Sequence, residues 1–505
     1  MAEVLQSTTI SAPGFYGLNT QDSGLQNSPS FALVAENCVI DKYGRIAVRK
    51  GWEAYSNQAD GVTGSVRAIG EHVETDGTYS ILFAANNKLW KFTDNARDPV
   101  ELTANSGTPI TITADDWKIV SYNNKTVFVQ QGHEMVYYDG SADEYFEYTN
   151  GPASTTPSCA AACFNRMWVA DDYTVYWSQI LDPTNFADVG SGFINMREVF
   201  GEDDTVTAIT EHNNRLIIFG QRNIAVFSGG EDPTGVGFML QDHISGIGCI
   251  ARDSVANVGT DVFFLSAEGV RTLGRTIQEN SSPVRDISRN VRDDLLDAVS
   301  GTNANQIKAV YSPTDAFYVL SIPGARISYV FDLRSQLQDG SMRATVWKQI
   351  NPTALLRRRD NTILMGQTAY VAQHTGYLDN EDEYEFKYYT SHMDFGNPAI
   401  EKILKKLKVV VYGSSEEALT VRFITDYTTK YAPETIPLTL FNIAEFGTAE
   451  FGIAEFSLGE AIQRFGINLR GKGSVIQLGF ELSVNNTKMS FQKLDIYSKT
   501  GKLIS

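Results

Sequence analysis

The 505-residue sequence predicts an all-β protein: a six- or seven-bladed β-propeller, with a C-terminal β-sandwich-like domain and an extended N-terminal arm. Three observations predict this architecture. A strand-turn-strand pattern recurs seven times at a spacing of roughly 40 to 55 residues, which is the length of a propeller blade. The 41 glycines, 23 tyrosines and 27 phenylalanines are typical of a turn-rich β protein. The sequence pattern then changes near Tyr388, which marks a further domain.

Residues 1–34 form the predicted arm. They are rich in Ser, Gly, Thr, Asn and Gln, and carry the isolated motif Gly14-Phe15-Tyr16-Gly17. We expect such a segment to be ordered only where it docks on another part of the molecule. The following residues, 35–49, read as a hairpin because two strand-like runs flank a turn at 41–44.

The predicted propeller covers residues 35–387. One blade cannot bury both of its faces, whereas blades packed radially bury them against each other and leave only short edges. The alternative is a pair of β-sandwiches whose hairpins resemble one another by chance. The seven strand pairs are 80–84 with 86–92, 123–129 with 135–140, 164–169 with 174–178, 213–219 with 224–229, 260–265 with 269–273, 316–320 with 329–332, and 362–366 with 369–371.

Two later segments depart from the blade pattern. A short amphipathic helix is predicted near 288–300, because Val291, Leu295 and Val299 share one helical face. Residues 388–505 are predicted to form the separate C-terminal β-rich domain, since strand-like runs open it at 402–413 and close it at 490–497.

A five-residue repeat lies inside this C-terminal domain. It places Phe446, Phe451 and Phe456 at intervals of five residues within the segment 443–457. Five residues match neither the helical nor the strand period, so we expect a loop anchored by its phenylalanines. Two interpretations stay open: a loop that contacts a neighbouring subunit or partner, and an ordinary loop packed on its own domain.

The charge and the cysteines restrict the classes of function. With 42 Lys and Arg against 60 Asp and Glu, the net charge is −18, which argues against a phosphate-gripping surface as the main function. Four cysteines are too few for a disulfide scaffold and indicate buried, reduced thiols. The N-terminal residues do not resemble a signal peptide, and no apolar run approaches the 18 residues of a membrane span.

The sequence gives little support for catalysis or for a cofactor. It has no Gly-x-Ser-x-Gly motif and no His-x-x-x-His pair, so we expect no enzymatic activity, cofactor or metal. Cys159 and Cys163 resemble half a metal site, but packing explains them better. The acidic runs 202–204 and 379–383 could bind a cation such as calcium or lie in solvated loops. Basic side chains at 357–359, 402, 405, 406 and 408 could contact nucleic acid, but Lys406 and Lys408 share one strand face, as expected of a solvated or subunit-facing side.

Three pairs of motifs carry a resemblance to a known family. They are AENCVID (35–41) with RKGW (49–52), VTAI (206–209) with IFGQRNIAVFSG (218–229), and GCIARDSV (248–255) with FLSAEGV (264–270). In this order they resemble the β-propeller tail proteins of short-tailed bacteriophages, which include the tail nozzle (tail tubular protein B) and packaged-DNA stabilisation families. The motifs consist of glycine and apolar positions, not of catalytic residues.

The resemblance implies a structural virion protein that is assembled in the host bacterial cytoplasm. Such a protein forms a ring, usually a hexamer, below the portal and adaptor, contacts other tail or fibre proteins, and retains the packaged DNA until ejection. In that setting we expect Glu202, Asp203 and Asp204 to face the DNA channel, where negative charge repels phosphate. The alternative function is a glycan-binding or polysaccharide-cleaving propeller that recognises the host surface, because sugar sites use aromatic side chains and paired carboxylates.

Overall fold

The computed structural model describes residues 5–57, 61–74, 76–105, 110–235, 237–274, 286–413, 417–427, 432–438 and 462–503. The chain divides into two compact units, and each is described here by itself. The sandwich unit consists of Met1–Glu53, Tyr329–Ile350 and Thr375–Ser505. The propeller unit consists of Ala54–Ser328 and Asn351–His374. No helix in the described ranges is long and apolar enough to span a membrane.

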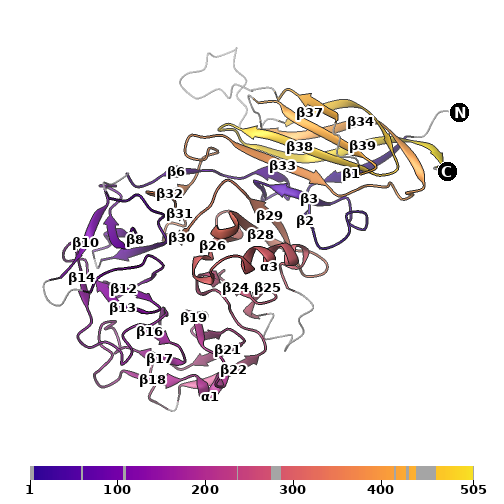
Figure 1. The fold of residues 1–505 in the computed structure, drawn as a ribbon. Helices are drawn as coiled ribbons and strands as arrows, with labels where there is room; N and C mark the ends of the chain where they lie inside the picture. The colour runs from indigo at the N-terminus through magenta and orange to yellow at the C-terminus, as the bar shows by residue number, and fades with distance from the viewer. Residues whose placement is uncertain are drawn as a thin grey trace. The chain divides into compact units, whose positions relative to one another are not determined.

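The described strands of the propeller unit fall into seven blades (Figure 1). Blade A is β7 (Ala68–Val73), β8 (Tyr79–Ala85), β9 (Lys88–Phe92) and β10 (Val100–Ala104); blade B is β11 (Lys118–Tyr122), β12 (Lys125–Gln130), β13 (His133–Tyr138) and β14 (Glu144–Glu147); blade C is β15 (Cys159–Cys163), β16 (Arg166–Asp171), β17 (Thr174–Trp177) and β18 (Gly192–Asn195); blade D is β19 (Val206–Glu211), β20 (Leu216–Gly220), β21 (Asn223–Ser228) and β22 (Met239–Ser245).

The remaining blades are shorter within this unit. Blade E is β23 (Ala256–Asn257), β24 (Val262–Ser266) and β25 (Gly269–Thr272); blade F begins with β26 (Lys308–Ser312) and β27 (Phe317–Ile322) and continues into β28 (Ile327–Gln336), which leaves the unit; blade G is β30 (Ala354–Arg357), β31 (Ile363–Gly366) and β32 (Val371–His374). The helical segments are α1 (Arg197–Phe200), η1 (Arg252–Ser254), η2 (Arg289–Val291), α3 (Arg292–Ser300), η3 (Ala304–Gln306) and η4 (Pro323–Ala325).

The first strands of the blades form a closed inner ring. Each of β7, β11, β15 and β19 contacts the next, η1 lies between β19 and β26, and β26 contacts β30, which returns to β7. The ring closes where the first and last segments of the propeller unit meet. The backbone N–H groups of Tyr55 and Ser56 donate to the carbonyl oxygen of Val371 in blade G at 2.8 and 3.0 Å. This closure distinguishes a propeller from the alternative of two sandwiches.

The hydrophobic cores lie between neighbouring blades. One core joins Phe83 and Trp90 of blade A to Leu364 of blade G, and another joins Trp168 of blade C to Leu216 of blade D. Further cores join blade A to B, B to C and D to E. Blades A to D therefore each bury both faces on their neighbours, as the sequence repeat predicts.

Asparagine explains why the repeat can be read from the sequence. Pairs of residues with positive φ form the tight turns between strands, and three of these pairs are Asn-Asn. At Asn86 and Asn87 the φ values are 59° and 57°, and the turn joins β8 to β9. Asparagine tolerates this left-handed conformation better than other non-glycine residues, which suits it to two-residue hairpins.

The sandwich unit contains two packed sheets. One has the order β37-β34-β39-β5-β4, with β1 on β39, and the other contains β2-β3-β33-β38-β35-β36 together with β29. The rings of Phe386 and Phe480, from the second sheet, lie 5.8 and 5.1 Å from Phe491 of the first. The strands are β1 (Gln6–Ser11), β2 (Gly17–Leu18), β3 (Phe31–Glu36), β4 (Cys38–Ile40), β5 (Ile46–Val48), β29 (Met342–Trp347), β33 (Tyr384–Thr390), β34 (Ile400–Gly413), β35 (Leu419–Thr425), β36 (Ala432–Ile436), β37 (Ile462–Gly473), β38 (Ile476–Val484) and β39 (Met489–Leu503), while β6 (Trp52–Ala54) leads into the propeller unit.

The predicted all-β propeller is confirmed, and all seven predicted strand pairs overlap observed strands, although 329–332 lies in the part of β28 that belongs to the sandwich unit. The predicted helix is present as η2 and α3, in which Val291 and Leu295 are fully buried. The unit boundaries differ from those expected: residues 35–53 and 329–350 belong to the sandwich unit. Within the expected arm, β1 pairs with β39 over its whole length.

Candidate functional site

A cluster of charged side chains lies where the inner strands of the propeller meet; we call it the axial cluster. It consists of Lys118, Arg252, Asp253 and Lys308. The carboxylate of Asp253 accepts from the Arg252 guanidinium and the Lys308 ammonium at 2.8 Å each, and from Lys118 at 3.2 Å. These residues come from blade B, η1 and blade F. One carboxylate thus holds three cations that would otherwise repel one another.

The surroundings of the cluster favour its charged form. Burial alone would raise the pKa of Asp253, but Arg252, Lys308 and Lys118 together lower it well below the usual range. Arg252 also donates to the backbone carbonyl oxygens of Ser158 and Asp116, both at 2.9 Å. The cluster therefore ties inner segments of several blades together across the propeller axis.

Two cavities described beside the axial cluster are small. One of about 130 Å³ is lined by Arg67, Lys118 and Lys308 among others, and one of about 320 Å³ by Cys159, Thr210 and Arg252 among others. The axis of this propeller is therefore too narrow for a DNA duplex, whose major groove alone is about 12 Å wide.

The residues of the acidic run 202–204, which were predicted to face a channel, differ in exposure. Glu202 and Asp203 are exposed, whereas Asp204 is only 4% exposed. The Asp204 carboxylate accepts from the backbone N–H groups of Gln221 and Arg222 at 2.7 and 3.0 Å. Asp204 thus stabilises the turn between β20 and β21. Because its carboxylate is buried and hydrogen-bonded there, it does not face a channel. The expectation is retained only for Glu202 and Asp203.

Replacing Asp204 by Ala is expected to lower the free energy of unfolding by about 1–3 kcal/mol, because buried donors lose their acceptor. Besides the two N–H groups, the side-chain amide of Asn223 donates to Asp204 at 2.7 Å. Guanidinium denaturation followed by circular dichroism measures the change. Asp203→Ala, at the exposed neighbour, is the control and should change stability by less than about 0.5 kcal/mol. Equal effects of the two variants would contradict this role.

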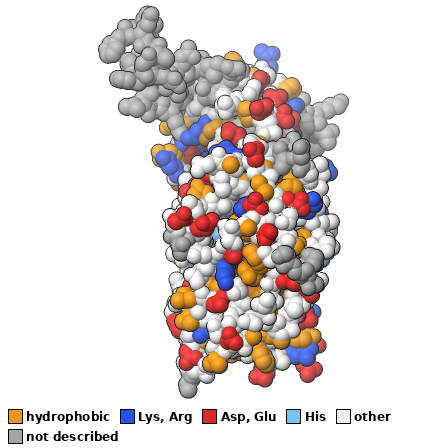
Figure 2. Space-filling view, turned by 90° about the vertical axis from the view of Figure 1, so that its left-hand side faces the viewer, with side chains coloured by type: hydrophobic (Ala, Val, Ile, Leu, Met, Phe, Trp, Pro, Cys, Tyr) orange, Lys and Arg blue, Asp and Glu red, His pale blue; other side chains and the backbone are white. Residues whose placement is uncertain are grey.

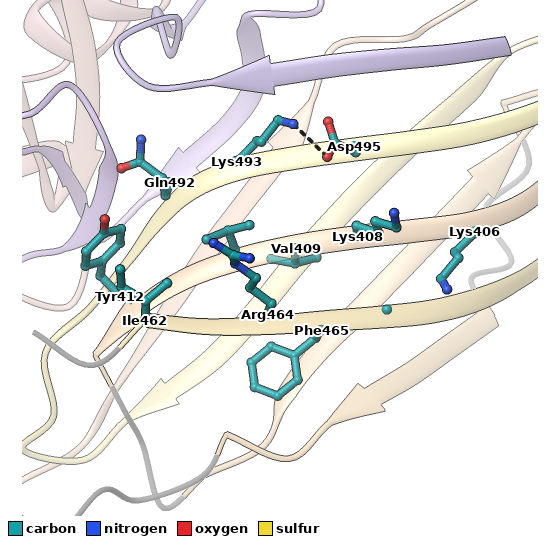
Figure 3. A pocket seen from close by; sticks show the side chains of 12 residues that line it. Lys406, Lys408, Val409, Tyr412, Ile462, Arg464, Phe465, Gln492, Lys493 and Asp495 are labelled. Atoms are coloured by element: carbon teal, nitrogen blue, oxygen red, sulfur yellow. Dashed lines mark ion pairs between the residues drawn. The ribbon is translucent and has the colours of Figure 1, made fainter. Parts of the chain in front are cut away.

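The sandwich unit carries a groove on the outer face of β37, β34 and β39, which we call the basic groove (Figure 3). Its volume is about 610 Å³. Lys406, Lys408, Arg464 and Lys493 line it, and Asp495 is the acidic member of the lining. Lys493 forms an ion pair with Asp495 at 2.9 Å. Tyr412, Ile462 and Phe465 add apolar surface at the groove.

The basic groove lies in the part of the chain with the least negative charge. Residues 388–505 contain 13 Lys and Arg against 12 Asp and Glu, although the whole chain carries −18. Four of those acidic residues, Glu445, Glu450, Glu455 and Glu460, fall in 439–461. The described part of the domain therefore has an excess of cations.

Other residues singled out from the sequence have structural contacts. Asp379 forms a two-point ion pair with buried Arg49, with both distances 2.7 Å. Arg358 is buried and pairs with Asp94 at 2.9 Å, and Lys402 is only 2% exposed.

Burial raises the pKa of Cys159 to about 12, so this thiol is unreactive at neutral pH. Among the described residues, no group of three His, Cys, Asp or Glu side chains could hold a metal ion.

Some candidates could not be placed, and others were missed from the sequence. Phe446, Phe451 and Phe456 lie outside the described residues. The axial cluster was missed because its members are spread over 190 positions, and only the adjacent pair Arg252-Asp253 gave a local signal. Arg464 and Lys493 were missed because no other cation lies within four residues of either in the sequence. Strand pairing alone places Arg464 and Lys493 on either side of Val410, which lies between Lys408 and Tyr412 in β34.

Comparisons with known proteins give one family match. The sequence model of the family described as "Bacteriophage P22 Gp10, beta-propeller" matches residues 107–380. No curated protein matches the chain.

Several solved structures match the chain at low identity and low TM-score. The extracellular domain of a protein described as a hybrid two component system from B. thetaiotaomicron has a TM-score of 0.40 and 11% identity, and covers 76% of this chain. The present chain spans 47% of that domain. YCF48 from Cyanidioschyzon merolae has a TM-score of 0.40 and 9% identity over 64% of this chain and 98% of its own. BamB from Moraxella catarrhalis has a TM-score of 0.35 and 11% identity over 73% and 99%.

Proposed function

Because the chain belongs to the bacteriophage P22 Gp10 β-propeller family, a family of phage structural proteins, we propose that it forms the nozzle ring of a phage tail. In this role several copies, six by our proposal, assemble below the portal and adaptor. They continue the DNA channel, retain the packaged genome and let it pass on ejection. The chain then acts as a wall and a support, and it needs no catalytic residue.

The filled propeller axis is the observation that carries this proposal. Arg252, Asp253 and Lys308 occupy the axis, and the two cavities described beside them measure only about 130 and 320 Å³. A duplex therefore has to pass beside the propellers and not through them. A wall around such a path needs several copies whose heterologous contacts close into a ring.

The distribution of charge also supports a passage for DNA. The chain carries −18, and Glu202 and Asp203 are exposed. On the side of the molecule that Figure 2 presents, acidic side chains are scattered among apolar and basic ones. Fixed cations on a channel wall would hold phosphates and slow their movement, whereas carboxylates leave the duplex free to slide.

Electron microscopy of phage particles with a gold-labelled antibody against the chain tests the proposal. Label at the single tail vertex, below the portal, is the expected result, with about six copies per particle by quantitative mass spectrometry. Label on fibres or on the capsid surface would favour host-surface recognition instead. Particles without any label would overturn the proposal entirely.

The double variant Glu202→Lys, Asp203→Lys is expected to slow DNA ejection several-fold at low ionic strength without reducing particle yield. Each substitution adds two positive charges per copy, and salt should weaken the effect because it screens exposed charges over about 10 Å. Dye release from particles opened in vitro gives the rate. Asp297→Lys, on α3, controls for a general charge effect. Unchanged kinetics at every salt concentration would remove these two residues from the channel wall.

A further inference from the structure

The basic groove presents its cations in rows across three strands. In one row Arg464 and Lys493 flank Val410, and in the next Lys408 lies between Gly466 and Asp495. Lys406 follows between Asn468 and Tyr497. Alternate residues of a strand are about 6.8 Å apart, so the cations extend along roughly 14 Å of the sheet. The groove is thus shaped for an extended anionic chain.

Aromatic and apolar side chains give the groove a second kind of contact. Lys408 lies 5.2 Å from the ring centre of Tyr497, and Tyr412 and Ile462 occupy one end of the groove. Gly466 leaves room beside the Lys406 side chain, since a Cβ there would come within 2.9 Å of its Cε atom. A segment that combines carboxylates with large apolar side chains would match both features.

This chain contains a segment with that chemistry. Residues 439–461, which lie outside the described residues, hold four glutamates and no Lys, Arg or His. Glu445, Glu450 and Glu455 recur every five residues, each followed by a phenylalanine. An extended chain advances about 17 Å in five residues, which is close to the length of the cation rows.

A nucleic acid fits the groove less well. The segment 439–461 ends at Ala461, directly before the groove residue Ile462. A phosphate backbone in the groove would have to bind a protein whose net charge is −18. Repulsion of this kind disfavours phosphate, whereas carboxylates of the segment itself can neutralise the groove.

We propose that the basic groove of one copy binds the Glu-Phe repeat, residues 443–457, of a second copy. This inference rests on the proposed ring. A ring of identical subunits needs a donor and an acceptor on every copy, and this chain provides both. The 25 residues from Pro437 to Ala461 can span up to about 80 Å when extended, so the repeat can reach a neighbour.

Zero-length crosslinking of purified particles tests the contact directly. A carbodiimide joins a lysine amine to a carboxylate only when the two groups touch. We expect amide links between Lys406, Lys408 or Lys493 and Glu445, Glu450 or Glu455, found by mass spectrometry in bands at multiples of 55.8 kDa on denaturing gels. The same links found only in the single-chain band would place the repeat in its own groove and overturn the proposal.

Charge reversal provides the second test. Lys406→Glu combined with Lys408→Glu is expected to reduce the number of copies per particle about tenfold or more, which corresponds to about 1.4 kcal/mol of lost contact. Lys405→Glu is the matched control, because Lys405 is exposed on the same strand but does not line the groove. Reversing the repeat as well, with Glu445→Lys, Glu450→Lys and Glu455→Lys, should restore incorporation.

The results separate this inference from the proposed function. A chain that is absent from particles would refute both. A chain found at the tail vertex without Lys-Glu links between copies, or a charge reversal that matches the control, would refute the groove contact alone. Unchanged thermal unfolding of the Lys406→Glu, Lys408→Glu variant ensures that lost incorporation reflects assembly and not folding.

Discussion

Replacing Asp253 by Asn is expected to lower the free energy of unfolding of the propeller unit by about 3–5 kcal/mol. The substitution keeps the size of the side chain but leaves Arg252, Lys308 and Lys118 without their shared anion. Arg252 and Lys308 are only 7% and 6% exposed, so water cannot replace the lost charge. Urea or guanidinium denaturation, followed by far-ultraviolet circular dichroism, measures the loss.

Two further variants make this experiment decisive. Glu101→Gln removes an ion pair with Lys88 in which both partners are well exposed, and should cost less than about 1 kcal/mol. Adding Lys308→Met to Asp253→Asn removes one of the uncompensated cations and should recover part of the loss. If Asp253→Asn costs no more than Glu101→Gln, the axial cluster does not stabilise the propeller.

The difference in stability between the native protein and Asp253→Asn should depend on pH. The folded-state pKa of Asp253 lies below the ordinary value of 3.8, so its charge stabilises the fold fully above that value. This contribution is lost as the pH falls from 3.8 towards the lowered pKa. The difference in stability between the native protein and Asp253→Asn should therefore be constant near neutrality and shrink in acid.

Replacing Trp168 by Ala is expected to cost about 3–5 kcal/mol, because it leaves a large cavity between blades C and D. Trp168 is fully buried, with ring centres of Trp177 and Phe238 at 5.4 and 5.8 Å. Its indole N–H donates to the carbonyl oxygen of Cys163 at 2.9 Å, and that acceptor would lose its partner. Circular dichroism is preferred to fluorescence here because the variant removes a fluorophore.

An exposed aromatic residue of the same blade provides the control for Trp168→Ala. Phe193, also in blade C, is 65% exposed, and Phe193→Ala should change the free energy of unfolding by less than about 0.5 kcal/mol. Trp168→Phe should fall between the two, since it retains an aromatic ring but loses volume and the indole donor. Similar values for Trp168→Ala and Phe193→Ala would show that the inter-blade core tolerates the cavity.

The blades could be predicted because the residues that define each hairpin lie close together in the sequence. A turn such as Asn86-Asn87 and the apolar strands beside it lie within about a dozen residues of sequence. The sandwich unit could be predicted only in its C-terminal part. Strands β3 and β29 join it from distant positions in the chain, and neither carries a pattern that distinguishes it from a propeller strand.

The candidate sites were harder to predict because they depend on pairing between distant strands. Lys408 was recognised as a solvated or subunit-facing cation, but its neighbours Arg464 and Lys493 lie more than 50 positions away. Asp204 shows the opposite case. Its sequence context, beside two other acidic residues, indicates a solvated loop, whereas its carboxylate is buried against the turn at Gln221 and Arg222.

The pairing of β1 with β39 has a consequence for how the protein is made. Ser11 lies opposite Lys493, so the first strand emerges from the ribosome nearly 480 residues before its partner strand begins. At 5–20 residues per second, translation separates the two by about 25–100 s. During that time β1 stays an unpaired strand, which can attract nascent copies of itself or a chaperone. The yield of assembled protein should therefore depend on the speed of translation and the supply of chaperones as well as on the stability of the finished fold.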